Sequence, residues 1–476
     1  MSAALRPASK MGVMADSQTE RLAYLAAHVL CLDNNGRPMQ DDGVWGRIFL
    51  QLSNQVGCVK AAAAAFGAAY ESFLDNSVEK SNCSAWRHYG SALSMLQSDI
   101  NTGISGPESL ALASIILACA EILSQHERNS FAHFLGAVQI LTKSHRCGWG
   151  ASRPDVDVLS KMKDELLRFD VLIGGYALSQ TPAFMHLESR WQGDVRGDNV
   201  FCEPEFAINA AMLCLHRSYQ FMEPAAKLRY TYPDWKEHDP DMCKRQSDAV
   251  GQCRSVLNGL GGLATRLHAQ YSPTTSTLRE SETLAEIYAL RTQLMSTIIY
   301  ILCAHSPFQT AYDDHQYLFQ SIVTDAAASA RLRRRAQSSA FKRFSARPGI
   351  ISSLFIVSIK CRDSPLRTLA TALLREQGRE GPTDGHIMAA IGTRLAAIET
   401  SSSLPSFQEA PIAACNVLEE RRVHGYGVSP PRLNGEGRRV VDVEFSRPKT
   451  PLLEGWGYVD YADLDNWVFW SETIDI

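Results

Sequence analysis

The stretch Leu354-Phe355-Ile356-Val357-Ser358-Ile359-Lys360-Cys361-Arg362-Asp363-Ser364-Pro365-Leu366-Arg367 decides the fold. It consists of an apolar segment, a sharp break and the start of a second helix. Ser364 has the side chain of an N-cap residue, and Pro365 at the first helical position lacks only a donor that would have no partner there. The leucines that follow at helical spacing predict one apolar stripe on this second helix: Leu366, Leu369 and Leu373.

The same periodicity predicts helices along most of the chain. A third helix is expected after the break at 381–384, with isoleucines and a leucine on one face up to Ile398. Other expected helices are 20–32, 45–74 with interruptions at Gly57 and Gly67, one capped by Ser84, 110–123 after a capping box at 105–108, 129–141, 155–178, 205–228, 241–269, 280–303 and 312–340. About a dozen helices without a fixed repeat predict an all-α, irregular multi-helix array.

The ends of the chain differ in composition from its helical part. Residues 1–17 predict a short disordered lead, and residues 18–425 predict a helical regulatory domain. From 426 to 476, Gly, Pro and Arg replace the helical pattern, and an irregular, poorly ordered C-terminal region is expected. Within it, the alternation from Val440 to Phe445 predicts a short strand.

Composition narrows the class of protein. Hydrophobic residues make up 45% of the chain and charged residues 21%, which is typical of a globular protein with a large core. The formal net charge of −4 indicates no overall affinity for nucleic acid or an anionic membrane. The longest apolar run, 110–123, is shorter than the ~20 residues that a membrane span needs. Twelve scattered cysteines favour a reducing, intracellular compartment.

Specific residues within this helical pattern carry a family resemblance. Leu354 to Asp363, Arg379-Glu380-Gly381 and Leu418-Glu419-Glu420 resemble the C-terminal part of the fungal-specific transcription-factor domain. This is the large helical region behind the DNA-binding module of fungal binuclear zinc-cluster regulators. Segments 86–93, 110–123 and 131–141 resemble the family's first helical block. With Leu166 to Tyr176 between the two blocks, the resemblance covers about residues 45–425. The family usually has an aromatic residue shortly after the Arg-Glu-Gly step, where this chain has Thr383.

The chain departs from the family at the zinc cluster. Such a cluster needs six thiolates in two runs of the type Cys-x2-Cys-x6-Cys, because each tetrahedral site is closed by nearby ligands. The first three cysteines, Cys31, Cys58 and Cys83, are more than 20 residues apart, and no Cys-x2-Cys occurs in the sequence. We therefore expect that this polypeptide lacks the DNA-binding module, contacts DNA only indirectly and holds no metal.

Arginines gather at the end of the expected helix 312–340. One interpretation is a nuclear-import signal or a phosphate-contacting patch. The alternative is a solvated helix end, where Arg in the last turn interacts favourably with the helix dipole. The candidate residues are Arg331, Arg333, Arg334, Arg335, Lys342 and Arg343.

The chain from 450 to 476 has no Lys or Arg and interleaves acidic with aromatic residues. This pattern is typical of activation segments that fold on binding a coactivator. The alternative is that the aromatic side chains dock on the helical body. The candidate residues are Trp456, Tyr458, Asp460, Tyr461, Asp463, Asp465, Trp467, Phe469 and Trp470.

The usual catalytic motifs are absent from the sequence. It contains no Gly-x-Ser-x-Gly elbow, phosphate loop or His-Glu-x-x-His. Gly259 to Gly262 lies in a helical pattern without the preceding strand that a dinucleotide site requires. The sequence therefore predicts no catalytic residue and no cofactor.

The resemblance implies a nuclear regulator of transcription in a filamentous fungus, with a secondary-metabolite gene cluster as its target. Without its own zinc cluster, it would act through a protein partner, as a homodimer or a heterodimer with a zinc-cluster regulator, and recruit the transcription machinery. A small-molecule effector is compatible with this interpretation. Two alternatives remain open: a helical small-molecule-binding protein or enzyme of a fungal biosynthetic pathway, and a scaffold without a ligand.

Overall fold

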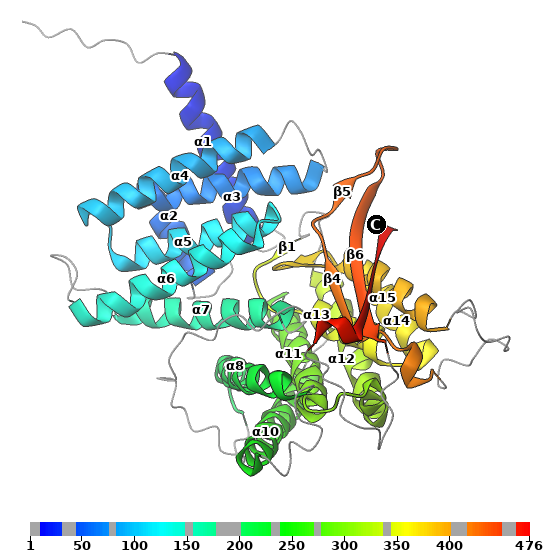
Figure 1. Cartoon of the computed structure of the whole chain (residues 1–476). Coiled ribbons are helices and arrows are strands. Elements are labelled where there is room, and N and C mark those ends of the chain that lie inside the picture. The colour runs from blue at the N-terminus through cyan, green and yellow to red at the C-terminus, as the bar shows by residue number, and fades with distance from the viewer. Residues whose placement is uncertain are drawn as a thin grey trace, which may run out of the picture. The chain divides into compact units, whose positions relative to one another are not determined.

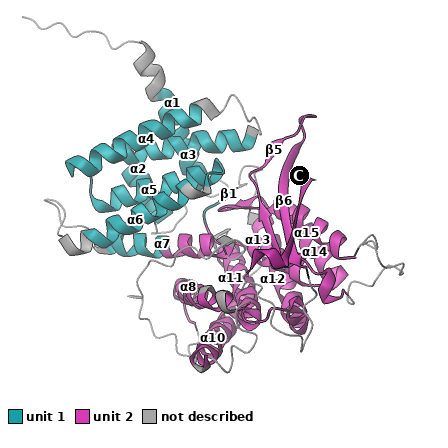
Figure 2. Cartoon of the chain, in the orientation of Figure 1, with its two compact units in different colours: residues 1–166, 339–346 teal, residues 167–338, 347–476 magenta. Residues whose placement is uncertain are grey.

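The computed structural model is predominantly helical, as the sequence predicts (Figure 1). The structure describes residues 10–30, 44–75, 82–147, 156–177, 201–229, 239–270, 278–336, 344–400, 417–449 and 463–476. The sequence predicted one helical body, whereas the chain divides into two compact units (Figure 2). Unit 1 comprises residues 1–166 and 339–346, and unit 2 comprises residues 167–338 and 347–476.

Unit 1 is built from antiparallel helices around the enclosed helix α5. Every residue of α5 except Glu108 is buried, which agrees with its apolar sequence on all sides. Helix α3 packs against α1, α4 and α5, and Gly67, predicted as an interruption, lies inside it. The elements of this unit are α1 Lys10–Leu30, η1 Val44–Ile48, α2 Phe49–Gln55, α3 Gly57–Asp75, α4 Asn82–Thr102, α5 Pro107–Leu123, α6 Glu127–Cys147, the first half of α7 Val156–Ala177, and β1 Phe344–Ser345.

Unit 2 places further helices around a large hydrophobic core. Helix α11 contributes many fully buried residues to this core and packs on α8, α10 and α12. The short strands β2 and β3 pair in antiparallel fashion between α14 and α15. The elements are α8 Pro204–Leu228, α10 Pro240–Gln270, α11 Leu278–Cys303, η2 Gln309–His315, α12 Gln316–Ala336, α13 Ile351–Lys360, α14 Ser364–Arg375, β2 Arg379–Glu380, β3 Thr383–Asp384, α15 Gly385–Thr400 and η4 Glu419–Arg421.

The C-terminal part of unit 2 adds a small antiparallel sheet to the helices. Its strands are β4 Gly425–Val428, β5 Arg432–Leu433, β6 Arg439–Pro448 and β7 Trp467–Asp475, with η5 Leu464–Asn466 before the last. Both β4 and β5 pair with one edge of β6, and β7 pairs with its other edge along nine residues. The strand predicted at 440–445 is confirmed, whereas the other strands of the region predicted to be irregular were missed. Residues 450–462 lie outside the described residues.

Two predicted helix starts differ in detail from the structure. Asp363, rather than Ser364, is the N-cap of α14, and its carboxylate accepts from the Leu366 N–H at 2.9 Å. The Ser105 hydroxyl donates to Asp99 at 2.6 Å instead of capping α5. At α14 the carboxylate of Asp363 takes the capping bond, whereas α5 begins after Gly106 without a side-chain cap. Leu369 is 48% exposed, so the buried stripe of α14 runs beside the predicted one.

Candidate functional site

The predicted basic cluster lies at the end of α12, and part of its charge is already paired. Arg333 donates to Glu380 at 3.4 Å, and Arg334 forms an ion pair with Glu376. Arg331 is exposed. The side chain of Arg335, together with Lys342 and Arg343, lies outside the described residues. Among the described side chains of this helix end, Arg331 and Arg334 are exposed, and Arg334 already has Glu376 as its ion-pair partner.

The described half of the acidic-aromatic tail belongs to the C-terminal sheet. Trp467, Phe469 and Trp470 lie in β7, and the Trp470 ring packs on Phe445 at 5.7 Å between centroids. Asp463 caps η5, while Asp465 lies inside it. Trp470 is partly buried against the core, whereas Phe469 is 46% exposed and Asp463 and Asp465 are exposed, so neither alternative describes all of these residues. The other candidates lie outside the described residues: Trp456, Tyr458, Asp460 and Tyr461.

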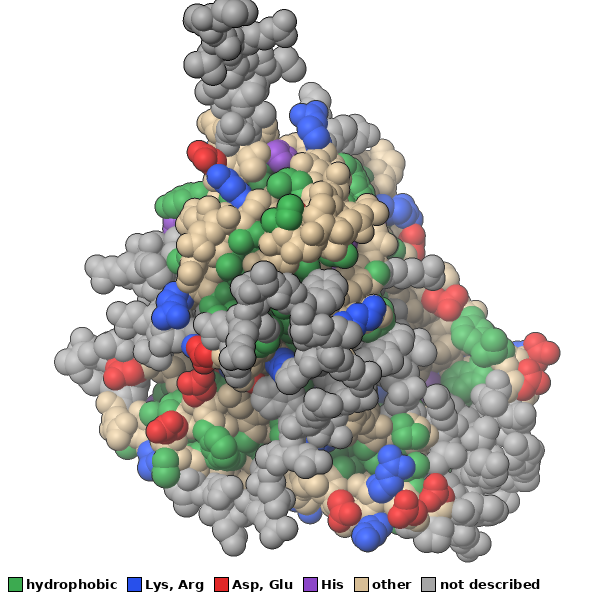
Figure 3. Space-filling model, turned by 90° about the vertical axis from the view of Figure 1, so that its left-hand side faces the viewer, with side chains coloured by type: hydrophobic (Ala, Val, Ile, Leu, Met, Phe, Trp, Pro, Cys, Tyr) green, Lys and Arg blue, Asp and Glu red, His purple; other side chains and the backbone are tan. Residues whose placement is uncertain are grey.

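On the face drawn in Figure 3, Lys and Arg side chains of the described residues are interspersed with Asp and Glu. Hydrophobic side chains form several separate patches between them. Exposed hydrophobic residues include Trp86, Leu93 and Ile100 of α4. No continuous basic surface of the kind that follows a nucleic-acid backbone covers the described part of this face.

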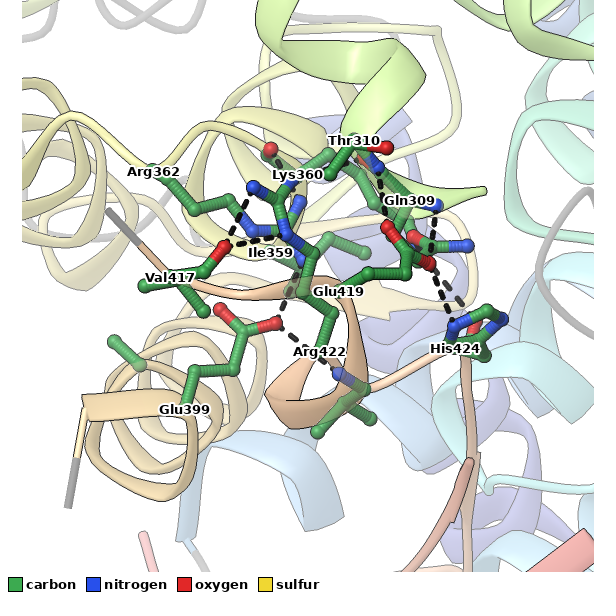
Figure 4. Close-up of polar contacts among 12 residues, drawn as sticks. Gln309, Thr310, Ile359, Lys360, Arg362, Glu399, Val417, Glu419, Arg422 and His424 are labelled. Carbon is green, nitrogen blue, oxygen red and sulfur yellow. Dashed lines mark hydrogen bonds and ion pairs between the residues drawn. The ribbon is translucent and has the colours of Figure 1, made fainter. Parts of the chain in front are cut away.

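Two of the segments that carry the family resemblance in unit 2, 354–363 and 418–420, contribute to a buried group of charged and polar residues (Figure 4). These residues come from η2, the end of α13, the start of α14, the end of α15 and the segment 417–424. We call this group the polar cluster. It comprises Gln309, Lys360, Arg362, Arg367, Glu399, Glu419, Arg422 and His424.

Glu399 forms the negative centre of the polar cluster. Its carboxylate accepts from Arg362 and from Arg367 at 2.6 Å each, and from the Val423 N–H at 3.1 Å. All three charged side chains are at least 95% buried. Burial opposes ionisation of Glu399, but the two guanidinium groups and their hydrogen bonds hold its pKa below the usual value. The triad is therefore an ion pair network that fastens α15 to α14 and to the 417–424 segment.

Positive charge exceeds negative charge in this triad. Two guanidinium groups face one carboxylate, and three buried N–H-bearing nitrogens of Arg362 and Arg367 have no hydrogen-bond partner. Burial lowers the pKa of Arg367 from its ordinary value, against the effect of Glu399. Removing the single carboxylate would leave two buried cations without a counter-charge. The folded state would then lose far more stability than the intact triad costs.

Lys360 is the most strongly perturbed base of the polar cluster. Its ammonium donates to the Gln309 side chain at 2.6 Å and to the His424 carbonyl at 3.4 Å, and lies 5.3 Å from the centre of the Tyr312 ring. Burial, with the nearby charges of Arg362 and Arg229, lowers its pKa to about 7. This lysine therefore changes its charge near neutral pH without a carboxylate in direct contact.

Glu419 and Arg422 bind the C-terminal segment to η2. The Glu419 carboxylate accepts from the backbone N–H groups of Gln309 and Thr310 at 2.7 and 2.8 Å, so it caps the start of η2. Arg422 donates to both carboxylate oxygens of Asp313 at 2.9 and 2.6 Å. Hydrogen bonds, including that from His424, hold the pKa of Glu419 below its ordinary value although burial opposes this. The arrangement positions charges and helix ends within unit 2.

The Arg-Glu-Gly step of the resemblance has its own structural role. The buried Glu380 carboxylate accepts from the N–H groups of Ile350 and Ile351 at 3.0 and 2.9 Å and so caps α13 from β2. Gly349 makes room for this carboxylate, since a Cβ there would lie 1.9 Å from its Oε1 atom. Gly381 adopts φ +53°, a conformation that favours glycine. The step is therefore a helix cap joined to a tight turn.

Sequence reasoning found some of these residues and missed their partners. The quoted segments include Lys360, Arg362, Glu380 and Glu419, but not Glu399. Glu399 follows Leu395 by four residues on the apolar face of α15, and an acidic residue at such a position is a signal for a buried ion pair. The partners lie 24 to 113 residues apart in the sequence, which periodicity cannot link.

A second buried pair lies between α7 and α8. His216 Nε2 is 3.1 Å from Asp170 Oδ2, and both side chains are at most 5% exposed. Neither residue was singled out from the sequence. Among the described residues, no group of three or more His, Cys, Asp or Glu side chains could hold a metal ion. Within the same residues, no helix combines the length and apolar character that crossing a membrane requires.

No protein-family model matches this chain, and neither a curated protein nor a solved structure shows a match.

Proposed function

We propose that this chain is a regulator of transcription that resembles the fungal zinc-cluster regulators, lacks their zinc cluster and acts in the nucleus through a protein partner. The observation that supports this is the position of the resembling residues. Arg362 and Glu419 belong to the polar cluster, Asp363 caps α14 and Glu380 caps α13. The resemblance therefore falls on residues with defined architectural roles rather than on scattered apolar positions.

The site chemistry agrees with a binding and regulatory role. The polar cluster fastens the 417–424 segment to η2, α13 and α15 by hydrogen bonds that involve charged groups, and one of its bases has a pKa of about 7. Near neutral pH, the states of the unit with charged and with neutral Lys360 therefore have similar free energies. A partner or a small-molecule effector that favours one state would then shift the population of the unit. The target genes would be those of a secondary-metabolite cluster, as the resemblance implies.

The first experiment follows the protein in the cell. A fluorescent fusion of the full chain is expected in the nucleus, and deletion of its gene is expected to change a defined set of transcripts. Arg331→Gln with Arg334→Gln should reduce nuclear accumulation. The matched control is Arg432→Gln with Arg438→Gln, which changes two exposed arginines of the C-terminal sheet region. A fusion that stays outside the nucleus under all conditions, with no transcript changed by deletion, would refute the proposal.

The second experiment tests indirect contact with DNA. Formaldehyde cross-linking should recover the chain on promoters of the responding genes, together with a zinc-cluster protein. Depleting that protein should remove the chain from the promoters. If the purified chain alone binds these promoter fragments with sequence specificity, the indirect mechanism is wrong. If a small metabolite is bound or converted and no promoter is occupied, the biosynthetic alternative takes its place.

A further inference from the structure

Two buried cysteines face each other in the core of unit 2. Cys214 lies on α8 and Cys253 on α10, two helices that pack side by side. Their Sγ atoms are 3.6 Å apart, and the residues are 3% and 0% exposed. Among the described residues, the structure contains one thiol–thiol contact, and it is this one. It has no part in the polar cluster or in the proposed contact with a partner.

The hydroxyl of Ser218 completes a small hydrogen-bond circuit with the two thiols. The Cys214 thiol donates to Cys253 Sγ, and Cys253 Sγ lies 3.2 Å from Ser218 Oγ. Ser218 in turn donates to the Cys214 carbonyl at 2.8 Å. The hydrogen bond from Cys214 lowers the pKa of Cys253 against the effect of burial, whereas the same bond and burial raise the pKa of Cys214. Cys253 is therefore the better nucleophile of the two.

We propose that Cys214 and Cys253 form a reversible disulfide that links α8 to α10 when the protein meets a hydroperoxide. The Cys253 sulfur attacks a peroxide oxygen, the O–O bond breaks, and the leaving oxygen takes the thiol proton. The Cys214 sulfur then attacks the resulting sulfenic acid at Cys253, the S–O bond breaks, and water leaves with the second thiol proton. In total, the two thiols give up two protons and two electrons to the peroxide, and the products are the disulfide, one water, and the alcohol or second water left from the peroxide.

The geometry favours the second step over competing reactions. The resolving sulfur already lies 3.6 Å from the sulfur that it attacks, and a disulfide needs about 2.05 Å. The surrounding core restricts access by a larger thiol such as glutathione, because both sulfurs are buried among apolar side chains. A small hydroperoxide enters when α8 and α10 separate locally, so oxidation is slow and selective.

The bond would close a loop of 39 sequence positions that includes the connection between α8 and α10. Cross-linking restricts the unfolded chain and stabilises the folded state. The ends of these helices also hold the last turn of α11: Arg229 donates to the Ala304 carbonyl and Gln246 to the Ile301 carbonyl. Oxidation therefore stiffens the part of unit 2 that surrounds α11.

The test treats the reduced full chain with hydrogen peroxide, blocks free thiols, and maps the peptides without a reductant. We expect a cross-linked peptide that joins Cys214 to Cys253, and its disappearance after dithiothreitol. The oxidised protein should unfold at a temperature about 5 °C higher than the reduced protein. Cys214→Ala and Cys253→Ala should each abolish the cross-link and the temperature shift.

The matched control is Cys303→Ala, which removes another buried thiol of the same unit and should preserve both effects. If an alanine variant does not fold, the peptide map of the unmodified chain decides. Oxidation that stops at sulfinic acid on either residue would overturn the proposal. So would a disulfide map that joins other cysteines, or peroxide treatment that leaves both thiols free to alkylate after unfolding.

Discussion

At the scale of single residues, Glu399 balances the positive charge of two buried arginines. Its carboxylate contacts both Arg362 and Arg367, and all three side chains are buried. A surface ion pair contributes ~0–1 kcal/mol, whereas breaking a buried pair leaves an uncompensated charge in a medium that solvates it poorly. The difference between these two situations can be measured within this chain.

Glu399→Gln is expected to lower the free energy of unfolding by about 3 to 5 kcal/mol, because two buried guanidinium groups lose their counter-charge. Glu376→Gln is the matched control, since Glu376 pairs with Arg334 at the surface with both side chains about half exposed. It should cost about 0–1 kcal/mol. Urea unfolding at neutral pH measures both. Equal losses in the two variants would show that the triad contributes no more than a surface pair.

Lys360 allows a pH-dependent prediction. Its pKa is lowered from 10.5 to about 7 in the folded chain, chiefly by burial. Above pH 10.5 both states are neutral; between 10.5 and 7 the unfolded state alone binds the proton; below 7 both states are charged. Stability therefore falls as the pH falls through this window, by about 1.4 kcal/mol per pH unit, and then levels off.

The variant Lys360→Met cannot bind this proton. Its unfolding free energy relative to the wild-type chain should therefore rise as the pH falls from 9.5 to about 7 and stay constant below. Urea unfolding of both proteins at several pH values gives this difference, in which the titration of all other groups cancels. A difference that does not change with pH would show that Lys360 keeps its ordinary affinity for a proton in the folded state.

At the scale of elements, α13 receives its N-terminal cap from a distant strand. No side chain at its own N-cap position, Ile350, binds the free N–H groups, and Glu380 of β2 does so instead. Glu380→Ala should cost about 1 to 3 kcal/mol, because two buried donors lose their acceptor. Gly349→Ala should also destabilise, because its Cβ would meet the Glu380 carboxylate.

A double-mutant cycle separates these two effects. If the clash is with the carboxylate, Gly349→Ala should cost much less in the Glu380→Ala background than in the wild-type chain. Urea unfolding of the four proteins gives the coupling free energy. Additive losses would mean that the cost of Gly349→Ala does not come from the approach of the Glu380 carboxylate.

The sequence predicted elements well where one physical signal dominated. Helical periodicity located α5, α11 and α15 within a few residues, and strand alternation located the centre of β6. The sequence did not predict elements whose structure depends on contacts with residues elsewhere in the chain. Strand β7 combines its alternation with acidic residues that also suit a solvated segment, and only its pairing with β6 distinguishes the two. The N-cap shifted from Ser364 to Asp363 because two neighbouring residues both have capping side chains.

At the scale of the whole molecule, the division into two units has no marker in the sequence. The boundary at residue 166 falls inside α7, without the glycine- and proline-rich linker that usually separates domains. The polar cluster was equally out of reach as a set, since its members come from five elements brought together by the fold. What the sequence did contain was Lys360 and Arg362 at the end of an apolar segment, and Glu419 at the start of a charged run.

This division predicts that damage to the polar cluster stays within unit 2. All contacts of Glu399 belong to unit 2, whereas α5 is enclosed by helices of unit 1. Compact units tend to unfold cooperatively and separately, and amide hydrogen exchange reports the free energy of each. In Glu399→Gln, the amides of α11 should therefore lose about a hundredfold of protection, which corresponds to about 3 kcal/mol, while those of α5 keep theirs.

Hydrogen exchange with mass spectrometry on the full chain measures both helices in one experiment. Glu376→Gln, with its exposed ion pair, should change neither by more than about fivefold. If α5 loses as much protection as α11 in Glu399→Gln, the two units unfold together. The division into units would then reflect only where contacts are dense, and neither unit would have a stability of its own. If only α11 responds, the polar cluster controls the stability of unit 2 alone, and a signal that changes its charge would act on that unit first.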